Sequence, residues 1–118
     1  MKKLSLLLIP MLLLLISSCS KDAQDGSAVI WFGESTSQQL VANGVTSLTY
    51  RVNGELVGSS AANVYYFTTP DCGQNASITY SKEPGSYAFT VKDQAGVTYW
   101  EGTADLTDGG CEAIELTF

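Results

Sequence analysis

Apolar residues recur at every second position along most of the chain after Val29. Turn-favouring residues (Gly, Asn, Asp and Pro) interrupt this alternation at the spacing of about ten residues that is typical of short antiparallel strands. No window shows the period of about 3.6 residues that a surface helix requires. The pattern therefore predicts β-strands at residues 27–34, 44–52, 54–58, 63–69, 75–81, 85–93, 97–107 and 111–118.

Two short segments predict how neighbouring strands are joined. Asn53-Gly54 favours a two-residue hairpin with a primed turn, and residues 93–96 (Asp-Gln-Ala-Gly) favour a second turn. About seven or eight short strands in one small chain indicate an all-β domain, a single antiparallel two-sheet sandwich of the immunoglobulin-like or prealbumin-like kind. The pattern leaves the order of the strands open.

The last strand contains a conflict of parity. Ile114, Leu116 and Phe118 share one face of the predicted strand, whereas Cys111 falls on the opposite face. We therefore expect a β-bulge, or a late start of the strand, near Glu112.

Aromatic doublets occur in three of the predicted strands, and each places one ring on either face of its strand. If Ile30, Phe32, Tyr65, Phe67, Trp100, Ala104 and Leu106 point inward, then Trp31, Tyr66 and Tyr99 point outward. Exposed rings on a sheet face stack on sugar rings or contact a partner protein. The alternative is that these three rings pack under loops or against neighbouring tyrosines.

The N-terminus has the three parts of an export signal. Met1-Lys2-Lys3 is positively charged, Leu4–Ile16 is apolar, and Ser17-Ser18 supplies small residues before a cleavage site. The apolar part spans 13 residues and includes a proline, whereas a transmembrane helix needs about 20. We therefore expect residues 1–18 to be a cleaved signal peptide.

Ile16-Ser17-Ser18-Cys19 resembles the lipobox of bacterial lipoproteins, in which the cysteine carries diacylglycerol and becomes the first residue of the mature chain. The resemblance implies that a lipidated Cys19 anchors the protein in a membrane, and two or three acyl chains bind almost permanently. The alternative is an ordinary secretory signal with Cys19 free or disulfide-bonded. We expect a polar tether over residues 19–27 and the sandwich domain over 28–118.

Ser20-Lys21-Asp22 is similar to the short export tags of lipoproteins from the Bacteroidota. In those proteins the tag directs the chain to the outer face of the outer membrane, so the resemblance implies a surface location at the bacterial outer membrane. A simple solvated tether explains the same residues, and the periplasmic orientation stays open.

The remaining two cysteines are Cys72 and Cys111. With Cys19 lipidated, they are the pair left to form a disulfide, which persists in an exported protein. A tetrahedral zinc site is a poor alternative, because the chain has no CxxC spacing and no histidine. We expect the bond Cys72–Cys111 and no bound metal.

Charge argues against nucleic acid as a partner. Removal of Lys2 and Lys3 leaves four of the six basic side chains against twelve acidic ones, a net charge of −8 (4 − 12). The four basic residues are scattered singly, whereas phosphate binding needs clustered Lys and Arg.

Catalytic motifs are missing from the sequence. Without histidine the chain lacks the commonest general base, and it contains no Gly-x-Ser-x-Gly, phosphate-loop or dinucleotide motif. Asp93, Asp105 and Asp108 lie in turn-like sequence, but their spacing is not that of a calcium loop and favours Asx turns instead. We expect that the protein is not an enzyme and that it binds no cofactor.

The C-terminal half resembles small lipoproteins of the Bacteroidota over roughly residues 64–118. The shared motifs are Pro-x-Cys-Gly at residues 70–73, Gly-x-Tyr at 85–87, Trp-x-Gly-Thr at 100–103 and Gly-Gly-Cys at 109–111. The resemblance implies a β-sandwich with one disulfide on a lipid anchor, and it supports the pairing of Cys72 with Cys111.

Two functions fit these observations. The first is a non-enzymatic binding or adhesion module that holds a glycan or an envelope protein through Trp31, Tyr66 and Tyr99. The second is a structural or accessory envelope lipoprotein with no small-molecule ligand. An outward cluster of the three rings favours the first.

Overall fold

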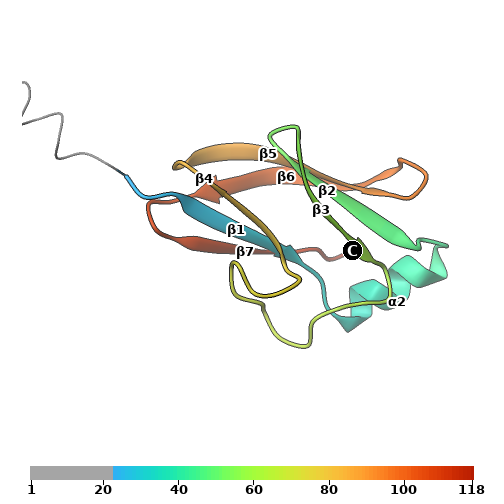
Figure 1. Ribbon diagram of the computed structural model, residues 1–118. Coiled ribbons are helices and arrows are strands. Elements are labelled where there is room, and N and C mark those ends of the chain that lie inside the picture. Colours follow the sequence, from blue (N-terminus) through green and yellow to red (C-terminus); the bar gives the residue numbers. More distant parts are fainter. Residues whose placement is uncertain (1–22) are drawn as a thin grey trace, which may run out of the picture.

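The computed structural model describes residues 23–118. The predicted signal peptide, the lipobox and Cys19 lie outside these residues. The described chain contains seven strands and one helix, and the strands form two sheets that pack face to face (Figure 1). No helix within residues 23–118 is long and apolar enough to cross a membrane.

The two sheets confirm the predicted all-β sandwich. One sheet has three strands in the order β4-β1-β7, formed by Ile78–Lys82, Gly26–Trp31 and Cys111–Glu115. The other has four strands in the order β3-β2-β5-β6, formed by Glu55–Ala61, Ser47–Val52, Gly85–Asp93 and Thr98–Leu106. All neighbouring strands are antiparallel except β1 and β7, which are parallel.

The hydrophobic core lies between the sheets and follows the predicted alternation. Leu48, Tyr50 and Val52 of β2 are at most 1% exposed, and they pack with alternate residues of the other strands. Both predicted turns are present. Asn53 and Gly54 have φ of 53° and 77°, as a primed hairpin turn requires, and the turn at residues 93–96 is closed by the bond from Gly96 N to Asp93 O.

A helix was not expected from the sequence. Residues 34–42 nevertheless form α2, Glu34–Ala42, which ends in a Schellman-type bond from Val45 N to Leu40 O with Gly44 at φ 79°. The helix turns mostly polar residues toward the sandwich. Its buried residues are Thr36, Ser37 and Leu40. Because two of these three are polar, the sequence shows no apolar residues repeating every 3.6 positions.

The strand expected at residues 63–69 is not formed. The segment from Ala62 to Ser77 is instead a long loop between β3 and β4 (Figure 1). The first strand, expected at residues 27–34, is β1 at Gly26–Trp31. The whole core, both sheets and the disulfide lie within residues 26–118, so a chain that begins at residue 20 retains the folded unit.

The bulge expected near Glu112 is also wrong. β7 pairs with β1 in one continuous register from Cys111 to Glu115. Glu112, Ile114 and Leu116 point toward the core side, and Cys111 points to the outer face of the three-stranded sheet. The conflict of parity disappears because Cys72 approaches that outer face from the loop, so Cys111 has no need to face inward.

Two bulges occur elsewhere, one in each edge strand of the four-stranded sheet. The register shifts by one residue at Val57 in β3 and at Tyr99 in β6. Bulges of this kind break the repeating pattern of an edge strand and protect it from pairing with another chain.

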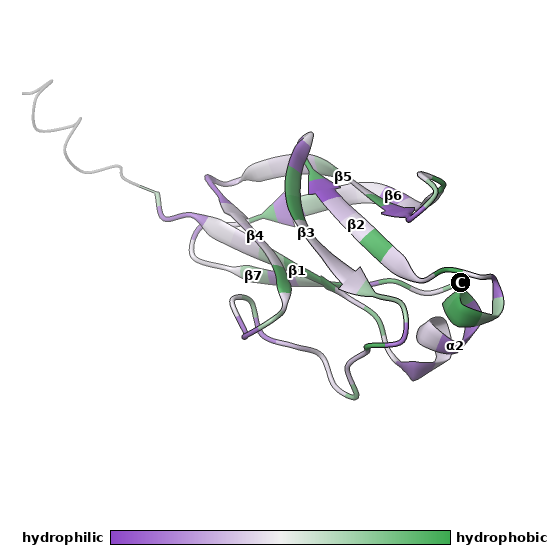
Figure 2. Ribbon diagram, turned by 45° about the vertical axis from the view of Figure 1, so that its right-hand side comes forward, coloured by the Kyte–Doolittle hydropathy of each residue, from purple (hydrophilic) through white to green (hydrophobic). Residues whose placement is uncertain are grey.

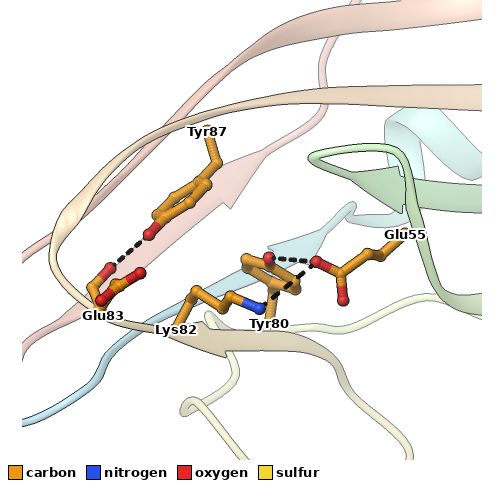
Figure 3. Close-up of polar contacts among 5 residues, drawn as sticks. All are labelled: Glu55, Tyr80, Lys82, Glu83 and Tyr87. Carbon is orange, nitrogen blue, oxygen red and sulfur yellow. Dashed lines mark hydrogen bonds and ion pairs between the residues drawn. The ribbon is translucent and has the colours of Figure 1, made fainter.

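Polar contacts close the gap between β3 and β4 at one end of the sandwich (Figure 3). The Tyr80 hydroxyl donates to Glu55 Oε2 at 3.0 Å, and Lys82 Nζ lies 3.7 Å from the same oxygen. Partial desolvation and this bond raise the pKa of the Tyr80 phenol. The Tyr87 hydroxyl donates to Glu83 O at 2.7 Å, which fixes the β4–β5 turn.

A candidate binding surface at the end that carries α2

Helix α2 is fastened to the sandwich by two buried hydroxyl groups. Thr36 Oγ1 donates to Leu116 O at 2.8 Å, and Ser37 Oγ donates to Ala62 O at 2.6 Å. Both side chains are almost fully buried, so each bond satisfies a carbonyl that lies outside the sheet ladders. The helix thereby ties the chain after β3 and the C-terminal segment to one end of the molecule, which we call the α2 end.

The β5–β6 hairpin also belongs to the α2 end (Figure 1). Gln94 Nε2 donates to Gly44 O at 3.0 Å, and Thr46 N donates to Gln94 Oε1 at 3.1 Å. Asp93 Oδ1 accepts bonds from the backbone N–H groups of Ala95 and Val97. Asp93 is therefore an Asx-turn residue, the alternative to a calcium ligand that the sequence favoured.

The predicted disulfide is present and fixes the long loop. Cys72 and Cys111 are bonded with an S–S distance of 2.03 Å and a sequence separation of 39. Gly73 N donates to Thr79 Oγ1 at 2.9 Å, and Thr79 pairs with Val29 in the middle of the three-stranded sheet. The loop of residues 62–77 therefore covers part of the outer face of that sheet.

This cover changes the interpretation of Trp31. The side chain lies on the opposite face of β1 from the core residues Ile30 and Phe32, as its parity predicted. It is nevertheless only 9% exposed, and Val29 on the same face is fully buried. The predicted exposure of Trp31 is wrong, because the long loop covers the face to which the ring points.

Tyr66 and Tyr99 are both partly buried, and they lie in different surroundings. Tyr66 N donates to Phe32 O at 3.1 Å, which brings the loop against the end of β1. Tyr99 is the extra residue of the β6 bulge and packs against Trp100 and Phe118, with ring centroids 6.0 and 6.3 Å away. The structure therefore does not bring the three predicted rings together as one exposed face.

A different group of apolar residues is exposed beside them. Val64 is 62% exposed and Phe67 is 85% exposed, although Phe67 was expected to point into the core. The Tyr65 ring meets Phe67 edge-on at 5.3 Å, and its hydroxyl donates to Glu34 of α2 at 3.2 Å. Partial desolvation and the Glu34 carboxylate raise the pKa of the Tyr65 phenol. We call residues 64–67 the aromatic segment.

Sequence reasoning missed the aromatic segment as an exposed site because it placed these residues in a strand. The signal was present in the consecutive residues Val64-Tyr65-Tyr66-Phe67, which do not alternate with polar residues. An unbroken apolar run in a small sandwich is compatible with a buried strand. It is equally compatible with a loop whose backbone turns successive side chains in different directions.

Two hollows flank the aromatic segment. A shallow one of about 240 Å³ lies between the end of α2 and the end of β3, lined by Val41, Val45, Thr46, Ala62 and Asn63. A narrow one of about 70 Å³ lies where the loop crosses the open edge between β3 and β4, lined by Ile30, Trp31, Phe32, Tyr50, Ser60, Val64, Tyr66, Ala76 and Ile78. Two of the three predicted site residues, Trp31 and Tyr66, therefore meet at the narrow hollow.

The α2 end carries hydrophobic stretches on α2 and at the tip of the β5–β6 hairpin, next to hydrophilic ones (Figure 2). Val41 of α2, Val97 of the β5–β6 hairpin and Phe118 are each more than half exposed. The opposite end contains the start of β1, where Gln24 N donates to Asp108 Oδ1 at 2.7 Å and Ser27 N donates to Gly110 O at 2.9 Å. In residues 23–118 no group of three or more His, Cys, Asp or Glu side chains is arranged to hold a metal ion.

Comparison with known proteins gives no indication of function, so the function is inferred from the geometry of the site. No protein-family model matches the chain, and no curated protein sequence does so either.

Proposed function

We propose that this protein is an exported lipoprotein, anchored by Cys19 and displayed at the bacterial outer membrane, that acts as a non-enzymatic binding module. The observation that carries the proposal is the exposed aromatic segment, in which Phe67 is 85% and Val64 is 62% exposed. Its ligand is a neutral glycan or an envelope protein. The lipid anchor is supported by the Ile16-Ser17-Ser18-Cys19 motif.

Exposure of the aromatic segment is not a consequence of a mobile chain end. Ser37 Oγ holds Ala62 at 2.6 Å, Tyr66 N is bonded to Phe32 O, and Cys72 is bonded to Cys111. The loop is therefore fixed on both sides of Phe67. Large apolar side chains that are held in water by a fixed backbone are typical of interaction sites.

The two ends of the sandwich favour presentation of the α2 end away from a membrane. The chain enters at the end that contains the β4–β5 and β6–β7 turns, and α2, the β5–β6 hairpin and the C-terminus lie at the other end (Figure 1). A lipid on Cys19 restrains the first of these ends. The aromatic segment then lies beside the end that is free to meet a ligand.

Charge selects among ligands. The full chain carries a formal charge of −6, and the chain after residue 18 carries more negative charge still. Anionic polysaccharides and nucleic acids are repelled by such a surface. Neutral glycans and proteins with neutral or basic surfaces are the compatible ligands.

Binding is tested with soluble residues 20–118, carrying the oxidised disulfide, on an array of neutral and anionic glycans and in capture from an envelope fraction. The proposal predicts a saturable contact that is lost when both Val64 and Phe67 are replaced by Ser. If no glycan or envelope protein binds, or if the double variant binds as the parent does, the binding module is rejected. The structural or accessory lipoprotein then becomes the better explanation.

A further inference from the structure

The narrow hollow beside the aromatic segment contains an unusual polar group. Trp31 lines the hollow, its indole Nε1–H is fully buried, and this group has no hydrogen-bond partner within residues 23–118. The other tryptophan behaves in the ordinary way, because Trp100 Nε1 donates to Thr117 O at 3.0 Å. A buried donor without an acceptor is costly, and such groups in folded proteins call for an explanation.

A pair of hydroxyl groups also lines the narrow hollow. Tyr50 Oη and Ser60 Oγ are 2.8 Å apart, and both residues line the hollow. Burial raises the pKa of Tyr50 to about 12, so the phenol stays neutral at physiological pH. One hydroxyl donates to the other, and the pair keeps acceptor capacity for a further N–H group.

The remaining walls are apolar and uncharged. Ile30, Ile78 and Ala76 contribute methyl groups, and among residues 23–118 no charged side chain lines the hollow. A charged ligand group would therefore lose its hydration without gaining a partner. The volume of about 70 Å³ is far below the range of about 300–1,000 Å³ for sites that enclose a whole small molecule. Only a substituent of a larger neutral ligand fits.

We propose that the narrow hollow binds the acetamido substituent of a neutral amino sugar. The acetamido carbonyl accepts from Trp31 Nε1, its N–H donates to the Tyr50–Ser60 hydroxyl pair, and its methyl group packs among Ile30, Ile78 and Ala76. The sugar ring stays outside, against Tyr66 and the aromatic segment. This inference rests on the proposed binding function and names the ligand class for it.

Binding requires a small displacement of the loop wall. The indole N–H is closed to solvent, and Val64, Tyr66 and Ala76 of the loop line the same hollow. Ala76 has φ 66°, a backbone region that residues with a Cβ rarely occupy. The unpartnered donor destabilises this arrangement relative to one in which the donor has an acceptor, and Ala76 is a residue of the loop whose backbone is strained.

Two indole N–H signals make a direct test possible, because the chain has two tryptophans. Soluble, ¹⁵N-labelled residues 20–118 are titrated with the β-1,4-linked trisaccharide of N-acetylglucosamine. The control is the β-1,4-linked trisaccharide of glucose, which differs by lacking the acetamido groups. We expect a saturable shift of the Trp31 indole N–H signal with the first sugar alone, and an unchanged Trp100 signal with both.

Two matched variants separate the effect of the Trp31 indole N–H on affinity from the effect of its aromatic ring. Trp31→Phe keeps an aromatic side chain and removes the N–H, so affinity for the acetamido trisaccharide should fall about 10-fold, the effect of one buried hydrogen bond. Trp100→Phe removes an N–H that is already bonded elsewhere, and its affinity should equal that of the parent. If Trp31→Phe fails to fold, the signals of the unmodified chain still decide the question.

The other outcomes overturn the proposal. Equal binding of both trisaccharides without a shift at Trp31 rejects the acetamido site and leaves the binding function intact. A shift caused by N-acetylalanine methylamide but not by either sugar assigns the hollow to a polypeptide amide instead. If no ligand shifts the Trp31 signal, the indole N–H has no part in binding and the acetamido site is rejected. The binding function is then tested separately by the glycan array and the capture from an envelope fraction.

Discussion

Tyr50 shows how one side chain serves both the core and the surface of the sandwich. Its ring is 1% exposed within the core, and its hydroxyl is bonded to Ser60 beside the narrow hollow. Burial raises the pKa of the phenol to about 12 from an ordinary value of 10. The contribution of Tyr50 to stability is therefore complete below its ordinary pKa. It declines at higher pH, where the tyrosine of the unfolded chain loses its proton.

This shift predicts a loss of stability in alkali. Below pH 10 Tyr50 is protonated in both states and contributes no pH dependence, and between pH 10 and 12 the unfolded state alone releases the proton. The free energy of unfolding should fall by about 1.4 kcal/mol per pH unit from this residue. Urea unfolding of the parent and of Tyr50→Phe at pH 9, 10.5 and 11.5 measures the difference. Equal slopes for the two proteins would show that Tyr50 is not responsible.

At the residue scale the alternation of side chains was predictable, and their exposure was not. The core positions Leu48, Tyr50 and Val52 follow from the period of two, since both sheets must bury one face. Trp31 has the predicted parity, but its face is covered by a loop that arrives from a distant part of the sequence. Such coverage depends on the path of the chain in space, which the local pattern does not contain.

At the scale of elements, the loop of residues 62–77 acts as a third layer over the outer face of the three-stranded sheet. Its contacts to that sheet include the bond from Gly73 N to Thr79 Oγ1, the bond between Ser77 Oγ and Thr79 Oγ1, and the disulfide from Cys72 to Cys111. Val29 and Trp31 are buried on that face. The loop is therefore held on that face by hydrogen bonds and by one covalent link, the disulfide.

Removal of that link should destabilise the domain and uncover Trp31. In the double variant Cys72→Ser, Cys111→Ser, the free energy of unfolding should fall by about 2–5 kcal/mol, the usual loss for a small exported domain. Chemical denaturation measures this loss, and acrylamide quenching of tryptophan fluorescence measures the exposure of Trp31. Trp100→Phe in both backgrounds leaves Trp31 as the one emitter. Unchanged quenching after removal of the disulfide would show that the loop stays in place without it.

Element types were predictable wherever alternation is strong, and α2 and the long loop are the exceptions. β5 and the Asn53-Gly54 hairpin follow the pattern because their side chains alternate between core and solvent. Helix α2 anchors itself with the hydroxyl groups of Thr36 and Ser37, which a hydrophobic pattern counts as exposed. The bulge at Tyr99 places two neighbouring rings, Tyr99 and Trp100, against the core cluster, which a strict alternation forbids.

At the scale of the whole molecule, the start of the folded chain and the aromatic segment are held separately. Gln24 N is bonded to Asp108 Oδ1, and an added Cβ at Gly26 would lie 2.3 Å from Thr107 O, so the start of β1 packs closely on the β6–β7 turn. The direction of the chain is thereby fixed at residue 24. In the proposed lipoprotein, residues 20–23, between Cys19 and this point, would keep this end of the sandwich near the membrane.

The proposed lipid anchor at Cys19 gives a prediction for the full-length protein. Cys19→Ala should abolish lipid attachment and leave the precursor uncut by the lipoprotein signal peptidase, because the resemblance to a lipobox assigns the lipid to the Cys19 thiol. Mass spectrometry of the mature N-terminus and detergent partitioning measure the two effects. Cys72→Ser is the matched control, since it removes a cysteine without touching the motif. An unmodified N-terminal residue other than Cys19 in the parent would reject the anchor.

The most direct test of the account compares two exposed apolar residues for their effect on ligand affinity. Phe67 is 85% exposed in the aromatic segment, and Leu56 is 61% exposed on the edge strand β3. Phe67→Ala should weaken the contact found in the glycan and envelope screens by about 5- to 150-fold, or about 1–3 kcal/mol. Leu56→Ala should change it less than about 2-fold, and both variants should unfold near the parent's midpoint, since neither side chain is buried. Parental affinity in Phe67→Ala, or an equal loss in Leu56→Ala, would contradict the central claim that the aromatic segment is the binding surface.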